Sequence, residues 1–339
     1  VILFSASEYN GRVRFHDSAY YFRKQLFASS LGLGVMYFVS NISYRFFVRL
    51  APAAYFLSML LSTAVLLFGQ EINGSKRWLN LGPLSVQPSE FAKVSVVLFL
   101  TWQIDNSRKK TDGFWFMFRT MFTLLPIVGL VGSNNLSTAI IILGIGVILI
   151  FVSSPHYLQF LALGSAGIGF ITIFLAAESY RLERLAIWRN PEKYEKGFQT
   201  IQGLYAIGSG GLLGRGLGNS IQKLGFVPEA QNDMIFSIIC EELGLFGGIA
   251  VILIFLLLIW RLMIIANNAS DLFGALLVVG VLGHIAIQVI LNVAVVTNSM
   301  PNTGVSLPFI SYGGTSLLFL MAMVGMLLNI SRYPKDREN

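Results

Sequence analysis

Apolar runs of about the length needed to cross a bilayer recur throughout this chain of 339 residues. A helix needs about 20 mostly apolar residues to span the hydrocarbon core, because it rises only about 1.5 Å per residue. Hydrophobic residues make up 55% of the chain, charged residues make up 12%, and the mean hydropathy is +0.68. This composition is that of an integral membrane protein, not of a soluble domain. The sequence therefore predicts an all-α polytopic membrane protein with a single integral membrane domain over residues 1–339.

Nine complete spans are predicted, preceded by a segment, VILFSAS, that has the composition of the end of another span. The nine lie at about residues 25–39, 50–68, 88–103, 118–132, 139–152, 157–176, 233–262, 273–296 and 317–330. A large loop is predicted at residues 177–232, and shorter loops of unusual composition at residues 69–88 and 297–316. No internal repeat or soluble domain accompanies them.

The formal net charge of +7 reflects Lys and Arg residues that collect in loops. The positive-inside rule places the short basic segments at residues 41–49, 105–119 and 261–272 and the C-terminal tail in the cytoplasm. The loops at residues 8–20, 69–88, 177–232 and 297–316 then fall on the outer side. The basic residues thus follow membrane topology, and no nucleic-acid partner is expected. The single cysteine, Cys240, lies within a span, so neither a disulfide framework nor a thiolate metal site is expected.

Acidic residues stand where an apolar span begins, in the stretch FVPEAQNDMIFSIICEELGLFGG over residues 226–248. Asp233 lies at the mouth of this span, and Glu241 and Glu242 lie two turns further along. A carboxylate within hydrocarbon costs at least about 2.5–3.5 kcal/mol, so such residues usually face a wet cavity or a partner charge. Asp233 also suits the N-cap of its own helix. The two acids behind it favour a functional role.

A second ionisable pair, Glu90 and Lys93, lies near the start of the span that follows the loop at residues 69–88. Residues spaced i, i+3 share one face of a helix, so the two side chains are expected to form an ion pair within the span. The pair either fixes helix packing or serves function, and the intramembrane position favours function.

Two glycine-rich segments interrupt the helical pattern. The run GSGGLLGRGLG at residues 208–218 lacks the Gly-Lys-Ser/Thr ending of a phosphate-binding loop and follows no strand, so it predicts a flexible or re-entrant backbone. The segment at residues 297–316 contains two prolines and a Gly-Gly pair, which exclude a continuous helix. It either lines a cavity or forms a tight connection between spans. His16, His156 and His284 have no metal-ligand spacing, so a structural zinc site is not expected.

Three long segments resemble the SEDS family of shape, elongation, division and sporulation proteins, which includes RodA, FtsW and SpoVE. They read KRWLNLGPLSVQPSEFAK, AIGSGGLLGRGLGNSIQKLGFVPEAQNDMIFSIICEELGLFG and PNTGVSLPFISYGGTSLL. The resemblance covers essentially the whole chain and implies a ten-span bundle whose first span is only partly present here. Where many members have Gln-Pro-Asp-x-Gly-Thr, this chain has SNNLST, with Asn135 in place of the acid. This segment and LGPLSVQPSE favour the division or sporulation branch, FtsW or SpoVE.

The resemblance implies a peptidoglycan glycosyltransferase that polymerises lipid II at the outer face of the bacterial cytoplasmic membrane. Asp233 matches the family's catalytic aspartate and is expected to be the general base on the acceptor 4-hydroxyl, with undecaprenyl pyrophosphate as the leaving group. Glu90 and Lys93 match the family's acid and base in PSEFAK, and nearby cations are expected to lower the pKa of Asp233. The candidates for binding substrate are Arg77, Lys76, Arg215, Lys223, Gln202 and Ser311.

A class B penicillin-binding protein, a transpeptidase, is the partner that the resemblance implies. A divalent cation, Mg²⁺ or Mn²⁺, is the candidate cofactor, although the sequence contains no dedicated site for one. No organic cofactor is expected. The main alternative function is a lipid II flippase, since charged residues in a helical bundle also serve transport. The third alternative function is that of a membrane protein that only activates the transpeptidase. This function would leave Asp233 without a role.

Overall fold

The computed structural model describes residues 1–72, 75–81, 84–107, 114–154, 160, 164 and 185–334. These residues form two compact units made of interleaved segments: residues 1–27, 161–257 and 288–313, and residues 28–160, 258–287 and 314–339. We call them unit 1 and unit 2. The predicted span at residues 157–176 lies outside the described residues, apart from Phe160 and Gly164.

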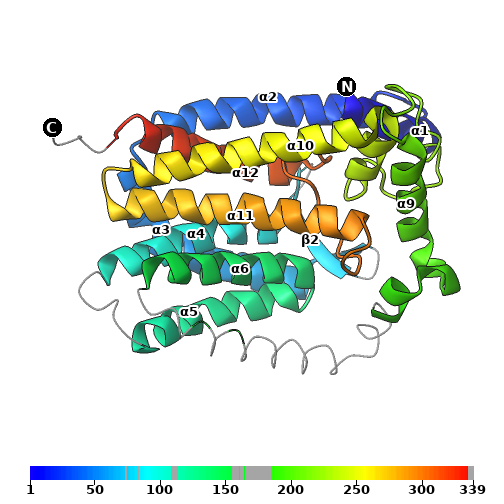
Figure 1. Cartoon of the computed structure of the whole chain (residues 1–339). Coiled ribbons are helices and arrows are strands. Elements are labelled where there is room, and N and C mark those ends of the chain that lie inside the picture. The colour runs from blue at the N-terminus through cyan, green and yellow to red at the C-terminus, as the bar shows by residue number, and fades with distance from the viewer. Residues whose placement is uncertain are drawn as a thin grey trace. The chain divides into compact units, whose positions relative to one another are not determined.

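Helices make up most of the described chain, as the ribbons of Figure 1 show. The helices are α1 (Ile2–Phe15), α2 (Tyr20–Ser40), α3 (Tyr44–Phe68), α4 (Pro88–Asn106), α5 (Phe114–Gly132), α6 (Leu136–Ser153), α9 (Phe198–Gly210), α10 (Ile235–Asn267), α11 (Leu272–Val296) and α12 (Gly314–Ser331), with 3₁₀ turns η1 (Pro191–Lys193) and η2 (Glu195–Gly197). Six of them, α3, α5, α6, α10, α11 and α12, are long and apolar enough to cross a membrane. The predicted all-α polytopic membrane fold is confirmed.

Three segments predicted as loops contain regular structure, and the largest, at residues 177–232, includes helix α9 and the turns η1 and η2. Helix α1 continues to Phe15, into the predicted loop at residues 8–20, because Glu8 and Arg12 form an ion pair at i, i+4 and the turn ends only at His16 in the left-handed conformation. The loop at residues 69–88 contains a three-stranded antiparallel sheet in the order β1-β2-β3. Its strands are β1 (Gln70–Ile72), β2 (Ser75–Leu81) and β3 (Leu84–Val86), with Asn80 opposite Ser85 in the second pairing.

Unit 2 packs around α4. Helices α3, α5, α6 and α12 all contact α4, and its apolar side chains Val96, Leu100 and Ile104 are fully buried. Pro88 at the first helical position fixes where α4 begins, since its missing N–H would have no intrahelical partner there. Asn135 caps α6 by accepting a hydrogen bond from the backbone N–H of Thr138 at 3.2 Å.

Contacts within each unit fit the predicted sidedness. In unit 2, the Asp271 carboxylate accepts a 2.7 Å hydrogen bond from the Tyr44 hydroxyl, which joins two segments predicted to be cytoplasmic. In unit 1, the backbone N–H of Tyr312 donates to the carbonyl of Gln231 at 2.9 Å, and the Asn10 amide donates to the Gln231 side chain at 2.8 Å. Three segments predicted to share the outer side therefore meet.

Candidate active site

Asp233 lies two residues before α10 and is buried, with 9% of its surface exposed. Its backbone carbonyl accepts a hydrogen bond from the Asn292 side-chain amide of α11 at 2.8 Å, and the same amide donates to the carbonyl of Val305 at 2.7 Å. One amide thereby holds together the start of α10, the end of α11 and the loop at residues 297–313. The position of Asp233 is fixed by these long-range contacts within unit 1.

The Asp233 carboxylate faces neutral polar groups. Gln199 of α9 donates from Nε2 to Oδ1 at 3.4 Å, and its own Oε1 accepts from the Asn302 amide at 3.0 Å. Gly304 has a φ of 65°, and a side chain there would begin 3.7 Å from Oδ2. Glycine at this position lets the backbone adopt the left-handed conformation close to the carboxylate. The loop at residues 297–313 thus forms one wall of the site.

Burial, together with the negative charge of Glu229, raises the pKa of Asp233 to about 7. Hydrogen bonds from Gln199 and from backbone N–H groups lower the pKa but do not offset burial. The prediction that a neighbouring cation lowers this pKa is wrong for the protein as described. Among the described residues of unit 1, no lysine or arginine forms an ion pair with Asp233. The carboxylate is therefore a stronger base than an ordinary aspartate.

Ser311 supports the site from the backbone side. Its hydroxyl donates to the carbonyl of Asn232 at 2.6 Å and accepts from the N–H of Leu307 at 2.8 Å. Both bonds lie within the protein and hold the loop at residues 297–313 against the residue before Asp233. The Ser311 hydroxyl retains one acceptor lone pair, so the predicted contact with substrate stays a prediction.

Helix α10 is broken at one point, and the glycine-rich run at residues 208–218 forms hydrogen bonds with the backbone there. Gly244 has φ 68° and ψ −166°, which interrupts the helix. The carbonyls of Glu241 and Glu242 accept from the N–H groups of Arg215 and Gly216, each at 2.9 Å. On the other side of the break, the N–H of Leu245 donates to the carbonyl of Gly211, also at 2.9 Å. The run is thus an ordered segment inserted into the helix, where it replaces hydrogen bonds that α10 cannot make itself.

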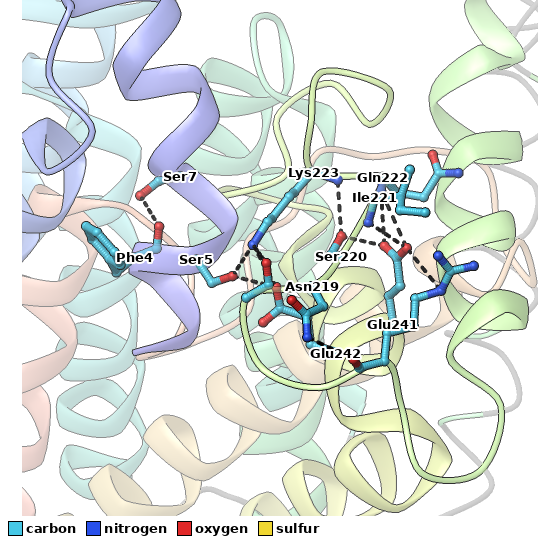
Figure 2. Close-up of polar contacts among 12 residues, drawn as sticks. Phe4, Ser5, Ser7, Asn219, Ser220, Ile221, Gln222, Lys223, Glu241 and Glu242 are labelled. Carbon is cyan, nitrogen blue, oxygen red and sulfur yellow. Dashed lines mark hydrogen bonds and ion pairs between the residues drawn. The ribbon is translucent and has the colours of Figure 1, made fainter.

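The remaining unit 1 candidates are Arg215, Lys223 and Gln202. Arg215 is exposed and its Nε lies 3.9 Å from Oε1 of Glu241. Lys223 is buried, and its ammonium contacts Glu242 at 3.1 Å (Figure 2). Gln202 is half-buried on α9, one turn from Gln199. Of these residues, only Arg215 offers an exposed cationic side chain.

Unit 2 holds the second group of candidates. Glu90 and Lys93 form the predicted ion pair at 2.9 Å, and both side chains are buried. Lys76 and Arg77 of β2 line a small pocket together with Ser89, the residue before Glu90. Arg77 also donates from Nε to the carbonyl of Asn134 at 3.3 Å. Two cations thus lie near the start of α4.

Sequence reasoning missed the amides around Asp233. Gln199, Asn292 and Asn302 come from three separate segments, so no local motif joins them. Asn292 was detectable, because an amide inside the apolar run of α11 is costly in a membrane and needs a partner. Glu229, whose charge acts on Asp233, was also missed.

The fold and this site define a class: polytopic membrane proteins that hold a buried acid at the start of a broken helix. The family model for FtsW, RodA and SpoVE, described as "Cell cycle protein", matches residues 1–336. The chain therefore belongs to the FtsW/RodA/SpoVE family, as the sequence predicted.

Named relatives and solved structures agree with this assignment. The chain is 38% identical to stage V sporulation protein E of Bacillus subtilis, over 99% of this chain and 93% of the relative. It is 36% identical to the probable peptidoglycan glycosyltransferase FtsW of Trichlorobacter lovleyi, over 98% and 88%.

Among solved structures, RodA of Thermus thermophilus matches with a TM-score of 0.69 and 27% identity, over 100% of this chain and 96% of that one. A chain of a peptidoglycan synthase complex, described as coordinating polymerization and crosslinking, matches with a TM-score of 0.81 and 27% identity, over 98% and 96%.

Proposed function

We propose that this protein is a peptidoglycan glycosyltransferase that polymerises lipid II into glycan strands at the outer face of the cytoplasmic membrane. The observation that carries the proposal is the burial of Asp233 among neutral amides, which raises its pKa to about 7. General bases work best when their pKa lies near the operating pH, because they are then both ionised and strongly basic. The name of the FtsW relatives supports the same activity.

In the proposed reaction, an Asp233 carboxylate oxygen takes the proton from the 4-hydroxyl of the acceptor N-acetylglucosamine. The freed oxygen attacks the anomeric carbon of the donor sugar, and the bond from that carbon to undecaprenyl pyrophosphate breaks with inversion. The pyrophosphate leaves with the bonding electron pair and needs no proton if cations neutralise its charge. Lys76 and Arg77, Arg215 and the Glu90–Lys93 pair remain the candidates to bind the anionic groups, and Gln202 remains a candidate for sugar binding.

A divalent cation, Mg²⁺ or Mn²⁺, is part of the proposal as a companion of the pyrophosphate. Within the described residues, no three His, Cys, Asp or Glu side chains are grouped to hold a metal. A hard cation takes about six oxygen ligands, so in this site most of them would come from phosphate and water. Glu229 is the nearest second carboxylate, but its Oε2 already accepts from the Asn232 amide.

The proposed partner is a class B penicillin-binding protein, which would crosslink the strands made here. The similarity to a chain of a synthase complex that couples polymerization with crosslinking supports this pairing. The relatedness to FtsW and SpoVE supports a role in division or sporulation.

The test is polymerisation of fluorescent lipid II by the purified protein, alone and with its transpeptidase, with glycan ladders resolved on a gel. Asp233→Asn is compared with Glu192→Gln, which neutralises an exposed acid in unit 1. Ladders from wild type and Glu192→Gln but not from Asp233→Asn would support the proposal. Ladders from all three would retain the enzyme and reject Asp233 as the base. Movement of lipid II across liposomes without ladders would favour the flippase, and loss of ladders under a chelator would support the cation.

A further inference from the structure

A buried polar network surrounds Glu241 and Glu242, on the part of α10 just before its break (Figure 2). The Lys223 ammonium makes three contacts: 3.1 Å to Oε1 of Glu242, 2.7 Å to the Ser5 hydroxyl and 2.6 Å to the carbonyl of Gly218. Ser5 also donates to Oε1 of Glu242. Because an ammonium has three donors, Lys223 is fully satisfied inside the protein. The network joins α1, the loop at residues 211–234 and α10.

Glu241 holds the same loop by a second set of bonds. Its Oε1 accepts from the N–H of Ile221 at 2.9 Å, and its Oε2 accepts from the N–H of Gln222 at 3.3 Å and from the Ser220 hydroxyl. A carboxylate that accepts several backbone N–H bonds fixes the conformation of the turn that supplies them. Two adjacent glutamates of α10 therefore hold residues 218–223 of the loop in place by hydrogen bonds and an ion pair.

Residues 224–232, which connect this part of the loop to Asp233, form a short segment with its own backbone hydrogen bonds. The N–H of Val227 donates to the carbonyl of Gln222, and the N–H of Asn232 donates to that of Glu229, both at 2.9 Å. The segment runs from Lys223, whose ammonium contacts Glu242, to Asp233, which lies two residues before α10. Ten residues of chain thus connect the clamped lysine with Asp233, whose backbone carbonyl is also held by Asn292.

We infer that the buried Lys223–Glu242 pair is a latch that positions Asp233, by clamping the loop at residues 217–233 onto α10. This inference rests on the proposed function for its catalytic consequence, but not for its structural one. A buried ion pair adds little net stability compared with apolar residues of similar volume, because desolvation offsets the attraction. Here the pair fixes the position of the Lys223 ammonium nitrogen. An apolar contact would not define that position.

The first test measures the latch without any enzymatic activity. Cys240→Ala removes the chain's single cysteine, and Asp233→Cys then reports access to the site through its rate of alkylation by a maleimide. Lys223→Met, the latch variant, leaves Glu242 buried without its partner charge and should raise this rate about tenfold or more, because the loop opens more often. A reporter at exposed Glu195 should react equally fast in both backgrounds.

The matched control removes an exposed ion pair of the same unit. Glu8→Gln with Arg12→Met abolishes the 2.6 Å pair on α1 and should leave the alkylation rate of the Asp233→Cys reporter unchanged. If the latch variant is lost during purification, Ser5→Ala removes one bond of the network without changing charge and should raise the rate about two- to threefold. Equal rates in the reporter protein with an intact latch, in Ser5→Ala and in the latch variant would overturn the inference.

The second test uses polymerisation with Asp233 in place. The latch variant should lose about tenfold or more in kcat with little change in KM, because the base is mispositioned while substrate contacts remain. The acidic limb of its pH–rate profile should move to lower pH, because a freed loop exposes Asp233 to water; the one charged side chain known to act on this carboxylate, Glu229, is unchanged. Lys223→Arg, which keeps the charge, should restore part of the rate.

The two tests separate the latch from the proposed function. Faster alkylation together with a wild-type protein that makes no glycan would retain the latch and reject the polymerase. An active latch variant with the wild-type kcat and pH–rate profile would reject the positioning role even if the protein were less stable.

Discussion

Replacing Asp233 with asparagine should stabilise the protein at alkaline pH while abolishing polymerisation. The folded state binds the Asp233 proton more tightly than the unfolded chain, because burial raises the pKa from 3.8 to about 7. The contribution of Asp233 to the free energy of unfolding is therefore most favourable at low pH, where the acid is protonated. It is lost as pH rises from about 4 to about 7. The gap between the two pKa values, at about 1.4 kcal/mol per unit, corresponds to about 4 kcal/mol above pH 7. Asparagine carries no such cost and retains an oxygen to accept from Gln199.

The assay is thermal unfolding in detergent at about pH 5 and about pH 8.5, a window in which about 3 kcal/mol of the difference develops. For a chain of this length, the Tm of Asp233→Asn relative to wild type should therefore be about 4–5 °C higher at pH 8.5 than at pH 5. Both proteins are heated at one rate, because the unfolding of membrane proteins is often irreversible. Glu192→Gln is the control, since its exposed acid should give the same Tm as wild type at both values.

The result that refutes this reasoning is a Tm difference between Asp233→Asn and wild type that does not change with pH. It would mean that Asp233 ionises with an ordinary pKa, so that water or a cation reaches it in the folded protein. A variant that is less stable at both pH values would show instead that the carboxylate holds the site together.

Three further predictions follow from the same geometry. Glu229→Gln removes the negative charge that raises the pKa of Asp233, so the acidic limb of the pH–rate profile should move to lower pH; an unmoved limb would contradict the coupling. Glu90→Ala leaves Lys93 buried without its ion-pair partner, which should cost about 3–5 kcal/mol in the free energy of unfolding, and a loss below about 1 kcal/mol would show that water reaches the lysine. Gly244→Ala should lower the free energy of unfolding by more than about 3 kcal/mol, because its positive φ disfavours a side chain and a Cβ would lie 2.3 Å from the nitrogen of Gly214. The control is Gly34→Ala, whose Cβ meets nothing within 4 Å and which should change stability by no more than about 1 kcal/mol.

The membrane helices were predictable because their signal is local and strong. Apolar runs, interrupted by charge and by Pro or Gly, located most spans within a few residues, and Pro88 marked the start of α4. The pairing of Glu90 with Lys93 was also predictable, since helical periodicity alone brings positions i and i+3 together. Strands β1 to β3 were missed, although the dipeptide Asn73–Gly74 between the first two is a strong hairpin signal.

The site itself was predictable only at Asp233 and not in its surroundings. Gln199 and Asn292 bond to Asp233 from 34 or more residues away in sequence, and Asn302 bonds to Gln199; no periodicity specifies such contacts. The break in α10 has the same origin. Gly244 alone would be an ordinary helix glycine, and only the inserted run at residues 211–216 supplies the bonds that stabilise the break. Long-range backbone pairing of this kind becomes visible only in three dimensions.

The direction of the Asp233 pKa shift changes the account of how the base works. A cation beside the carboxylate, as the sequence reading assumed, would keep Asp233 ionised but would make it a weak base, because each unit of lowered pKa reduces its proton affinity tenfold. Burial among amides has the opposite effect: near pH 7 only about half of the molecules carry the ionised form, but that form accepts a proton far more readily. The cations that the reaction needs are then best placed at the leaving pyrophosphate, where they stabilise developing negative charge without weakening the base. A rate that rises through pH 7 and then levels off would fit this division of roles, whereas a rate already constant from about pH 5 would indicate a base held ionised by a nearby cation.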